Sequence, residues 1–272
     1  MRHMHITGSS FGKWLGTSLG CALLCGALSP VLLAQAGQNR PKSVDDAMNE
    51  IKQGQITPAT LQRIARAGAV DAIPLLRQQF VRTEESLLKE AIASALVRLG
   101  DKDRTYWDFL ETHARDVVQS DAPFPMSFDV QGNIVPKQFS QEFLDWAKTN
   151  HVDPQAAATT QMQSSPAQIT FLAATGDQRG LELLRRAVAS RNYFVEAVAA
   201  RGLAKLQDVD SVPLIVTACK RAPADAAALI ARSLVFFNTP PAQSAAETFI
   251  KNREVLDELR KISRDKGADA LF

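Results

Sequence analysis

Residues 57–100 read TPATLQRIARAGAVDAIPLLRQQFVRTEESLLKEAIASALVRLG, and they have the pattern of three short amphipathic helices. Thr57 is a favourable N-cap, and Pro58 suits the first helical position, where no backbone donor is needed. Gly68 and Gly100 follow apolar runs and are typical helix stops. Between these signals apolar residues recur at i, i+3 and i+4, so the stretch predicts consecutive helices that each bury one face.

Parts of this stretch recur later in the chain with altered residues. The patterns of 57–68, 70–76 and 95–101 return at 165–176, 209–215 and 202–208. The local spacing is close to 31 residues, as from Asp177 to Asp208. A repeat of this length, with two helices per unit, is typical of stacked helix pairs that form a solenoid.

The motif V-D-x-[IV]-P-L-[LI] opens one helix at 70–76 and at 209–215, and A-L-x-x-L-G-D closes its neighbour at 95–101. Together these motifs resemble HEAT repeats, most closely the short HEAT-like form that is also found in phycobilisome lyases. The resemblance covers 57–116 and 165–249. It implies an all-α fold, an α-solenoid of antiparallel helix pairs, and a scaffold role, because HEAT proteins are mainly scaffolds.

Several residues of the repeats have an expected local role. Asp71 is expected to cap the helix that follows it, with Pro74 in the first turn, where a missing N–H costs little. Pro213 takes the same position in the second copy. Small residues are expected to let neighbouring helices approach closely; these are Ala91, Ala95, Ala199 and Gly202.

Residues 1–36 have the features of a cleavable signal peptide. Arg2 and Lys13 form a basic start, residues 14–33 are mostly apolar, and Ala34-Gln35-Ala36 is a favourable cleavage site. The apolar segment is also 20 residues long, so an uncleaved membrane anchor is the alternative. We expect export to the periplasm or the extracellular space, with no stable membrane insertion after cleavage.

Charge and cysteine content narrow the possibilities after cleavage. Residues 1–36 hold two of the 31 Lys and Arg and none of the 29 Asp and Glu, so 29 charges of each sign remain. This balance gives no basic field for nucleic acid, and we expect no nucleic-acid partner. Cys219 is then the one cysteine that remains in the sequence, so it cannot form an intramolecular disulfide. Its apolar helical surroundings predict a buried core residue.

The chain divides into four expected parts: the signal peptide 1–36, N-terminal repeats 37–118, an insertion 119–165, and C-terminal repeats with a capping helix 166–272. The insertion alternates around Gly132-Asn133, which predicts a β-hairpin. A helix follows with apolar residues around Phe143, and 155–164 is expected to be helix or linker.

Aromatic residues concentrate around the insertion. Of the 16 that remain after cleavage, eight lie between Tyr106 and Trp146. They are expected either to form a satellite core or to line a partner groove. Two arginines of a basic row along the repeats are also candidates for partner contacts, unless that row is simply a solvated face. The candidate binding residues are Trp107, Phe124, Phe128, Phe139, Trp146, Arg185 and Arg186.

A search for catalytic chemistry yields little. His113 with Asp116, and His151 with Asp153, have spacings that suit a metal or an oriented base, but further ligands at a recognisable spacing are missing from the sequence. No nucleophile, zinc or phosphate-loop motif is present. We therefore expect no catalytic residue, no metal and no cofactor.

The sequence favours an exported scaffold that binds a protein or peptide partner without catalysis. A small-ligand binder that uses the aromatic insertion is the first alternative. A lyase-type enzyme, by analogy with the lyases that share these short repeats, is the second. The oligomeric state stays open.

Overall fold

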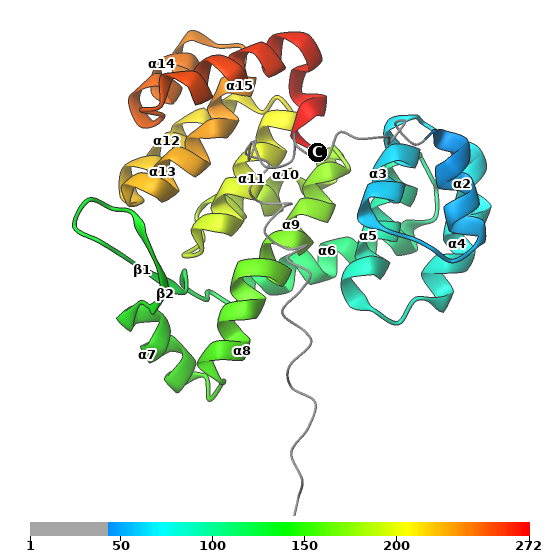
Figure 1. Cartoon of the computed structure of the whole chain (residues 1–272), viewed down its shortest axis with the longest axis horizontal. Helices are drawn as coiled ribbons and strands as arrows, with labels where there is room; N and C mark the ends of the chain where they lie inside the picture. The colour runs from blue at the N-terminus through cyan, green and yellow to red at the C-terminus, as the bar shows by residue number, and fades with distance from the viewer. Residues whose placement is uncertain (1–42) are drawn as a thin grey trace, which may run out of the picture. The chain divides into compact units, whose positions relative to one another are not determined.

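The computed structural model describes residues 43–272, which belong to one compact unit. It is mostly helical with a small two-stranded antiparallel sheet, as Figure 1 shows. The predicted helical class and the inserted hairpin are therefore confirmed. The signal peptide expected at 1–36 lies outside the described residues.

Between residue 43 and the insertion the described chain has five α-helices. Thr57 caps the second of them by accepting a hydrogen bond from the Thr60 N–H, as its position predicts. Gly68 and Gly100 follow helix ends with φ of 62° and 81°, in the left-handed region that favours glycine. The helices are α2 (Val44–Lys52), α3 (Pro58–Arg66), α4 (Ile73–Arg82), α5 (Ser86–Arg98) and α6 (Arg104–Gln119).

The expected cap at Asp71 is wrong. Asp71 lies inside a 3₁₀ turn, Val70–Ala72, and its side chain makes no capping hydrogen bond to α4. The turn runs directly into α4, so the first N–H groups of that helix are already engaged in helical bonding. Pro74 nevertheless lies in the first turn of α4, and Pro213 has the same place in α12 (Val212–Arg221), as expected.

The insertion contains a hairpin and two helices. Strands β1 (Met126–Phe128) and β2 (Ile134–Phe139) pair antiparallel, with Phe128 opposite Ile134. The Asp129 carboxylate accepts hydrogen bonds from the N–H groups of Gln131 and Asn133 and so closes the turn. The helices are α7 (Gln141–Thr149) and α8 (Pro154–Thr159), and a π-helical turn, Thr160–Ser164, joins α8 to α9 (Ser165–Ala174).

The chain after α9 continues as helices connected by short turns. Its helices are α10 (Leu181–Val188), α11 (Tyr193–Lys205), α12, α13 (Ala224–Ala231), α14 (Pro240–Phe249) and α15 (Arg253–Lys266). Four 3₁₀ turns accompany them at Gln178–Gly180, Val209–Ser211, Arg232–Phe236 and Gly267–Leu271.

Two rows of helices organise the packing. In the central row α3 contacts α5, α5 contacts α9, α9 contacts α11, and α11 contacts α13. The flanking row comprises α2, α4, α6, α10, α12 and α14. Its members contact their neighbours in the central row and one another, and the ring of Phe80 on α4 packs against Tyr106 and Phe109 on α6.

Helices α9 and α11 pack closely because residue 202 on α11 is a glycine. A Cβ atom on Gly202 would lie 2.8 Å from the Cβ of Ala173 and 2.9 Å from a methyl group of Leu184. Real Cβ atoms do not approach so closely, so the helix spacing here depends on glycine. The expected role of Gly202 in close helix approach is confirmed.

The same kind of ion pair occurs twice between a flanking and a central helix. Arg77 on α4 donates two hydrogen bonds to Asp101, which follows α5, at 2.8 and 2.6 Å. Arg185 on α10 bonds in the same way to Asp208, which follows α11, at 3.0 and 2.8 Å. The Arg77 guanidinium lowers the pKa of Asp101, whose side chain is fully buried. Each pair ties a flanking helix to the end of its central partner.

Replacement of Gly202 by valine tests the close approach of α9 and α11. We expect Gly202→Val to destabilise the fold by about 2–4 kcal/mol, because the new side chain forces the helices apart. Urea unfolding followed by circular dichroism measures the change. Lys220→Val, on the exposed face of α12, controls for valine in a helix. Equal effects of the two substitutions would contradict the packing argument.

Candidate binding site

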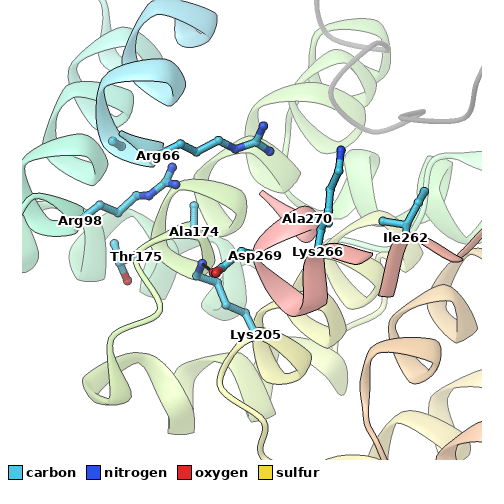
Figure 2. A pocket seen from close by; sticks show the side chains of 10 residues that line it. Arg66, Arg98, Ala174, Thr175, Lys205, Ile262, Lys266, Asp269 and Ala270 are labelled. Carbon is cyan, nitrogen blue, oxygen red and sulfur yellow. Dashed lines mark hydrogen bonds and ion pairs between the residues drawn. The ribbon is translucent and has the colours of Figure 1, made fainter. Parts of the chain in front are cut away.

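The carboxyl ends of the central-row helices meet at a pocket of about 620 Å³. Figure 2 shows side chains from α3, α5 and α11 on its walls, with α15 and the turn after it completing the rim. The lining residues are Ala65, Arg66, Arg98, Ala174, Thr175, Lys205, Ile262, Lys266, Asp269 and Ala270.

Four of the lining side chains are cationic. Arg66, Arg98, Lys205 and Lys266 each occupy the last turn of a helix, respectively α3, α5, α11 and α15. A basic residue is favourable there because the helix end presents unpaired carbonyl groups and a partial negative charge. Because four such helix ends converge, four positively charged side chains lie close together at the pocket.

Two of the four cations have partners within the described chain. Arg66 donates from Nε and Nη2 to the main-chain oxygen of Phe272, at 3.1 and 2.8 Å. Lys205 Nζ lies 3.3 Å from Asp269. Between residues 43 and 272 neither Arg98 nor Lys266 has a hydrogen-bond or ion-pair partner. Burial and the charge of Arg66 lower the pKa of Arg98, while the nearby charge of Asp269 acts in the opposite direction.

The pocket has a charge that the chain as a whole lacks. Four cations and one carboxylate line it. Residues 1–42 contain four of the 31 Lys and Arg, so residues 43–272 hold 27 against 29 Asp and Glu. The described chain is therefore slightly acidic, and a net positive charge of three at one pocket is a local feature.

A further arginine lies beside the pocket, under the ring of Phe272. The Arg201 guanidinium is 5.8 Å from the ring centre, and Phe272 is only 8% exposed. Burial and the nearby charge of Arg232 lower the pKa of Arg201 to about 10. Phe272 thus connects two arginines, since its main-chain oxygen accepts from Arg66 and its ring covers Arg201.

The aromatic residues that sequence suggested as binding groups do not share one groove. Trp107 on α6 is 2% exposed, and its ring lies 4.3 Å from the Arg179 guanidinium. Its Nε1 donates to Glu111. This tryptophan is packed between α6 and the turn before α10, away from the hairpin aromatics.

The other four fall into two ring clusters. Phe124 and Phe128 contact each other and Tyr193, with centroids 5.5–5.7 Å apart. Phe139 and Trp146 both pack against Phe143, which is fully buried. Phe124 is buried, while Phe128, Phe139 and Trp146 are half-buried. These contacts favour the satellite-core interpretation for the insertion.

The two candidate arginines have different surroundings. Arg185 is committed to Asp208 and also pairs with Glu182 at 2.8 Å. Arg186 is exposed on α10. Neither belongs to the residues that line the basic pocket.

The insertion is docked at the opposite ends of the central helices from the pocket. The Asp225 N–H, in the first turn of α13, donates to the Gly132 carbonyl, and the Ile134 N–H donates to the Asp225 carboxylate at 3.0 Å. Arg191, before α11, pairs with Asp121 and Glu142. In Figure 1 the hairpin reaches across to α13.

The remaining candidate groups show no catalytic arrangement among residues 43–272. His113 bonds through Nδ1 to the Phe109 carbonyl, and His151 is exposed. The described residues include no group of three or more His, Cys, Asp or Glu placed to hold a metal. Cys219 is 1% exposed, and burial raises its pKa to about 12, so the expected core position is confirmed.

Two glutamates are buried in the central row. Burial raises the pKa of Glu196, on α11, to about 7, although Arg221 donates to its Oε1 at 2.7 Å. Burial likewise raises the pKa of Glu90 on α5, against hydrogen bonds from Gln168 and Ser86. In the described chain the second carboxylate oxygen of each has no hydrogen-bond partner.

Comparison with protein-family models, curated proteins and solved structures finds no match to this chain. The resemblance to HEAT repeats therefore stays a prediction. Over residues 43–272 no helix is both long and apolar enough to cross a bilayer.

The basic pocket is the feature that sequence reasoning missed. Its four cations are far apart in the sequence, and each alone is an ordinary helix-terminal residue. One signal was available in the sequence: Arg66, Arg98 and Lys205 are each the last residue of a helix in the central row.

The docking of the hairpin on α13 is testable at Gly132. A Cβ atom there would lie 2.6 Å from the Ala224 nitrogen, and the φ of 84° disfavours any other residue. We expect Gly132→Val to detach the hairpin tip and to speed amide exchange in 126–139 by at least about tenfold. Hydrogen–deuterium exchange with mass spectrometry measures this. Gln131→Val, at the exposed neighbouring position, is the control, and unchanged exchange in Gly132→Val would contradict the docking.

The buried Glu196 predicts a pH-dependent stability. Between the ordinary glutamate range and about pH 7 the unfolded chain loses this proton while the folded chain keeps it. The contribution of Glu196 is therefore full at low pH and is lost as pH rises through about 7. We expect Glu196→Gln to gain roughly 2–3 kcal/mol relative to wild type between pH 5 and pH 8. Urea unfolding at both pH values tests this.

The exposed Glu254→Gln on α15 is the control for that comparison. It should show no such pH-dependent gain. A constant difference between wild type and Glu196→Gln across the range would mean that Glu196 is ionised in the folded chain.

Proposed function

We propose that this chain is an exported α-solenoid scaffold of the HEAT type, which binds a protein or peptide partner and performs no catalysis. The observation that carries the proposal is the pair of helix rows with a repeated Arg–Asp pair, Arg77–Asp101 and Arg185–Asp208. The same tie between two pairs of helices is what a repeated helix-pair unit needs to stack in a regular way.

The shape and the charge of the surface support binding of a partner rather than catalysis. Stacked pairs expose long continuous helix faces, which suit an extended partner. The concentrated positive charge lies at the basic pocket, where four helix ends meet. Desolvated arginines are frequent anchors in protein interfaces. We place the partner surface on this edge, with the docked insertion as a packing element at the other.

Export is proposed from the first residues. The basic start, the apolar run and the Ala34-Gln35-Ala36 site together support a signal peptide. The location would be the periplasm or the extracellular space.

A small-ligand binder is the second candidate function. The volume of about 620 Å³ is within the range of small-molecule sites, which favours this alternative at the basic pocket rather than at the aromatic insertion. The aromatic rings there are occupied with one another.

Capture of a partner in the native cells tests the proposal. The affinity tag belongs in the exposed loop at 150–153, because Phe272 is buried beside the pocket and a tag there would disturb it. We expect a chain shortened by the signal peptide in the exported fraction. After cross-linking, the tagged chain should be recovered together with a partner protein. When that partner is tagged instead, it should recover this chain. An unrelated exported protein with the same tag is the control.

Two outcomes would contradict the proposal separately. A full-length chain retained inside the cell would remove export. The lack of any partner that passes the reciprocal capture would remove the scaffold function.

A further inference from the structure

We propose that the basic pocket is a receptor for acidic side chains: it binds two or more carboxylates from an Asp/Glu-rich segment of a peptide or protein partner. This rests on the proposed function for the nature of the partner, and it names the chemistry by which that partner is recognised.

The first support is the incomplete compensation of Arg98. Within residues 43–272 Arg98 makes no hydrogen bond or ion pair, and it is half-buried with Arg66 and the single acid Asp269 nearby, while Lys266 is exposed at the rim. A partly desolvated cation next to a second cation is unfavourable unless an anion joins them. An incoming carboxylate supplies that anion and the hydrogen-bond acceptors that the guanidinium lacks.

The second support is the surplus of donors. A guanidinium has five N–H donors and an ammonium group three. Arg66 uses Nε and Nη2 on a single oxygen, that of Phe272, and Lys205 meets one oxygen of Asp269. The four cations therefore have donors left for more than one carboxylate. Guanidinium forks match carboxylate oxygens in particular.

The third support is an acid of the same chemistry already at the site. Asp269 belongs to the turn after α15, and its carboxylate lies 3.3 Å from Lys205 Nζ with the side chain 93% exposed. Figure 2 shows it between Lys205 and the arginines on the opposite wall. A carboxylate from the chain itself thus occupies part of the pocket, and because it is exposed it is held weakly.

The lining distinguishes acidic peptide from other anions. Ala65, Ala174, Ile262 and Ala270 provide aliphatic wall, which suits the methylene groups of Asp and Glu side chains. No aromatic side chain is among the lining residues, so the stacking platform that single-stranded nucleic acid uses is missing from this part of the described chain. The volume of about 620 Å³ also exceeds the needs of a single inorganic ion.

The test is fluorescence anisotropy with a labelled hexaglutamate peptide at low salt, and hexaglutamine as the uncharged probe. We expect wild type to bind hexaglutamate and not hexaglutamine. Arg98→Gln combined with Lys266→Gln should weaken binding by about tenfold or more, because two charge-assisted contacts are lost. Asp269→Asn should tighten it about two- to fivefold, since the competing carboxylate is neutralised.

The matched control is Arg82→Gln combined with Lys261→Gln. It changes the net charge equally, and its residues are exposed, on α4 and α15, and absent from the pocket lining. We expect binding within twofold of wild type. Thermal melts of all variants check that each is folded.

Several outcomes overturn the proposal. Equal weakening in the pocket and control variants would mean nonspecific attraction. Binding of citrate or pyrophosphate that depends on Arg98 and Lys266, without binding of hexaglutamate, would assign the pocket to a small polyanion instead.

The two proposals fail in different ways. If the Arg98→Gln, Lys266→Gln chain still captures the cellular partner fully, the scaffold function stands and the pocket assignment falls. If hexaglutamate binding behaves as expected but no cellular partner passes reciprocal capture, the pocket chemistry stands and the scaffold function falls.

Discussion

The close contact between α9 and α11 is the constraint on which the rest of the structure depends. Gly202 on α11 lets that helix lie directly against Ala173 on α9, and α9 in turn packs against α5 and α6 from the part of the chain before the insertion. The same two helices supply both functional regions of the fold. Their amino ends face the docked insertion, and their carboxyl ends contribute Ala174, Thr175 and Lys205 to the pocket. A change in this spacing therefore alters the pocket and the insertion together.

Charge is distributed in three distinct ways. The Arg77–Asp101 and Arg185–Asp208 pairs are neutral ties between helices, and the buried Glu196 is held by a partly exposed Arg221. The basic pocket gathers four cations around one acid. A basic residue at a helix end is favourable because it faces the partial negative charge of that end. The excess of positive charge at the pocket arises because several such helix ends converge there, and no single helix end determines the site.

Local structure could be predicted well from this sequence, and the site could not. Thr57 and Gly68 mark helix boundaries because caps depend only on neighbouring residues, and the turn around Gly132 follows from the same kind of rule. Asp71 failed as a cap because the preceding 3₁₀ turn had already engaged the helix start. The aromatic residues were grouped by sequence proximity, yet Trp107 packs on Arg179 rather than with the hairpin rings. Arg66 and Lys266 are brought together by tertiary packing, which local patterns do not report.

The contact between Arg66 and Phe272 also determines when the pocket can form. These residues are 206 positions apart, and their hydrogen bonds join the carboxyl end of α3 to residue 272. The pocket is lined by Ala65 and Arg66 from one end of the described chain and by Asp269 and Ala270 from the other. Its walls are therefore complete only when both ends of the described chain are folded in place.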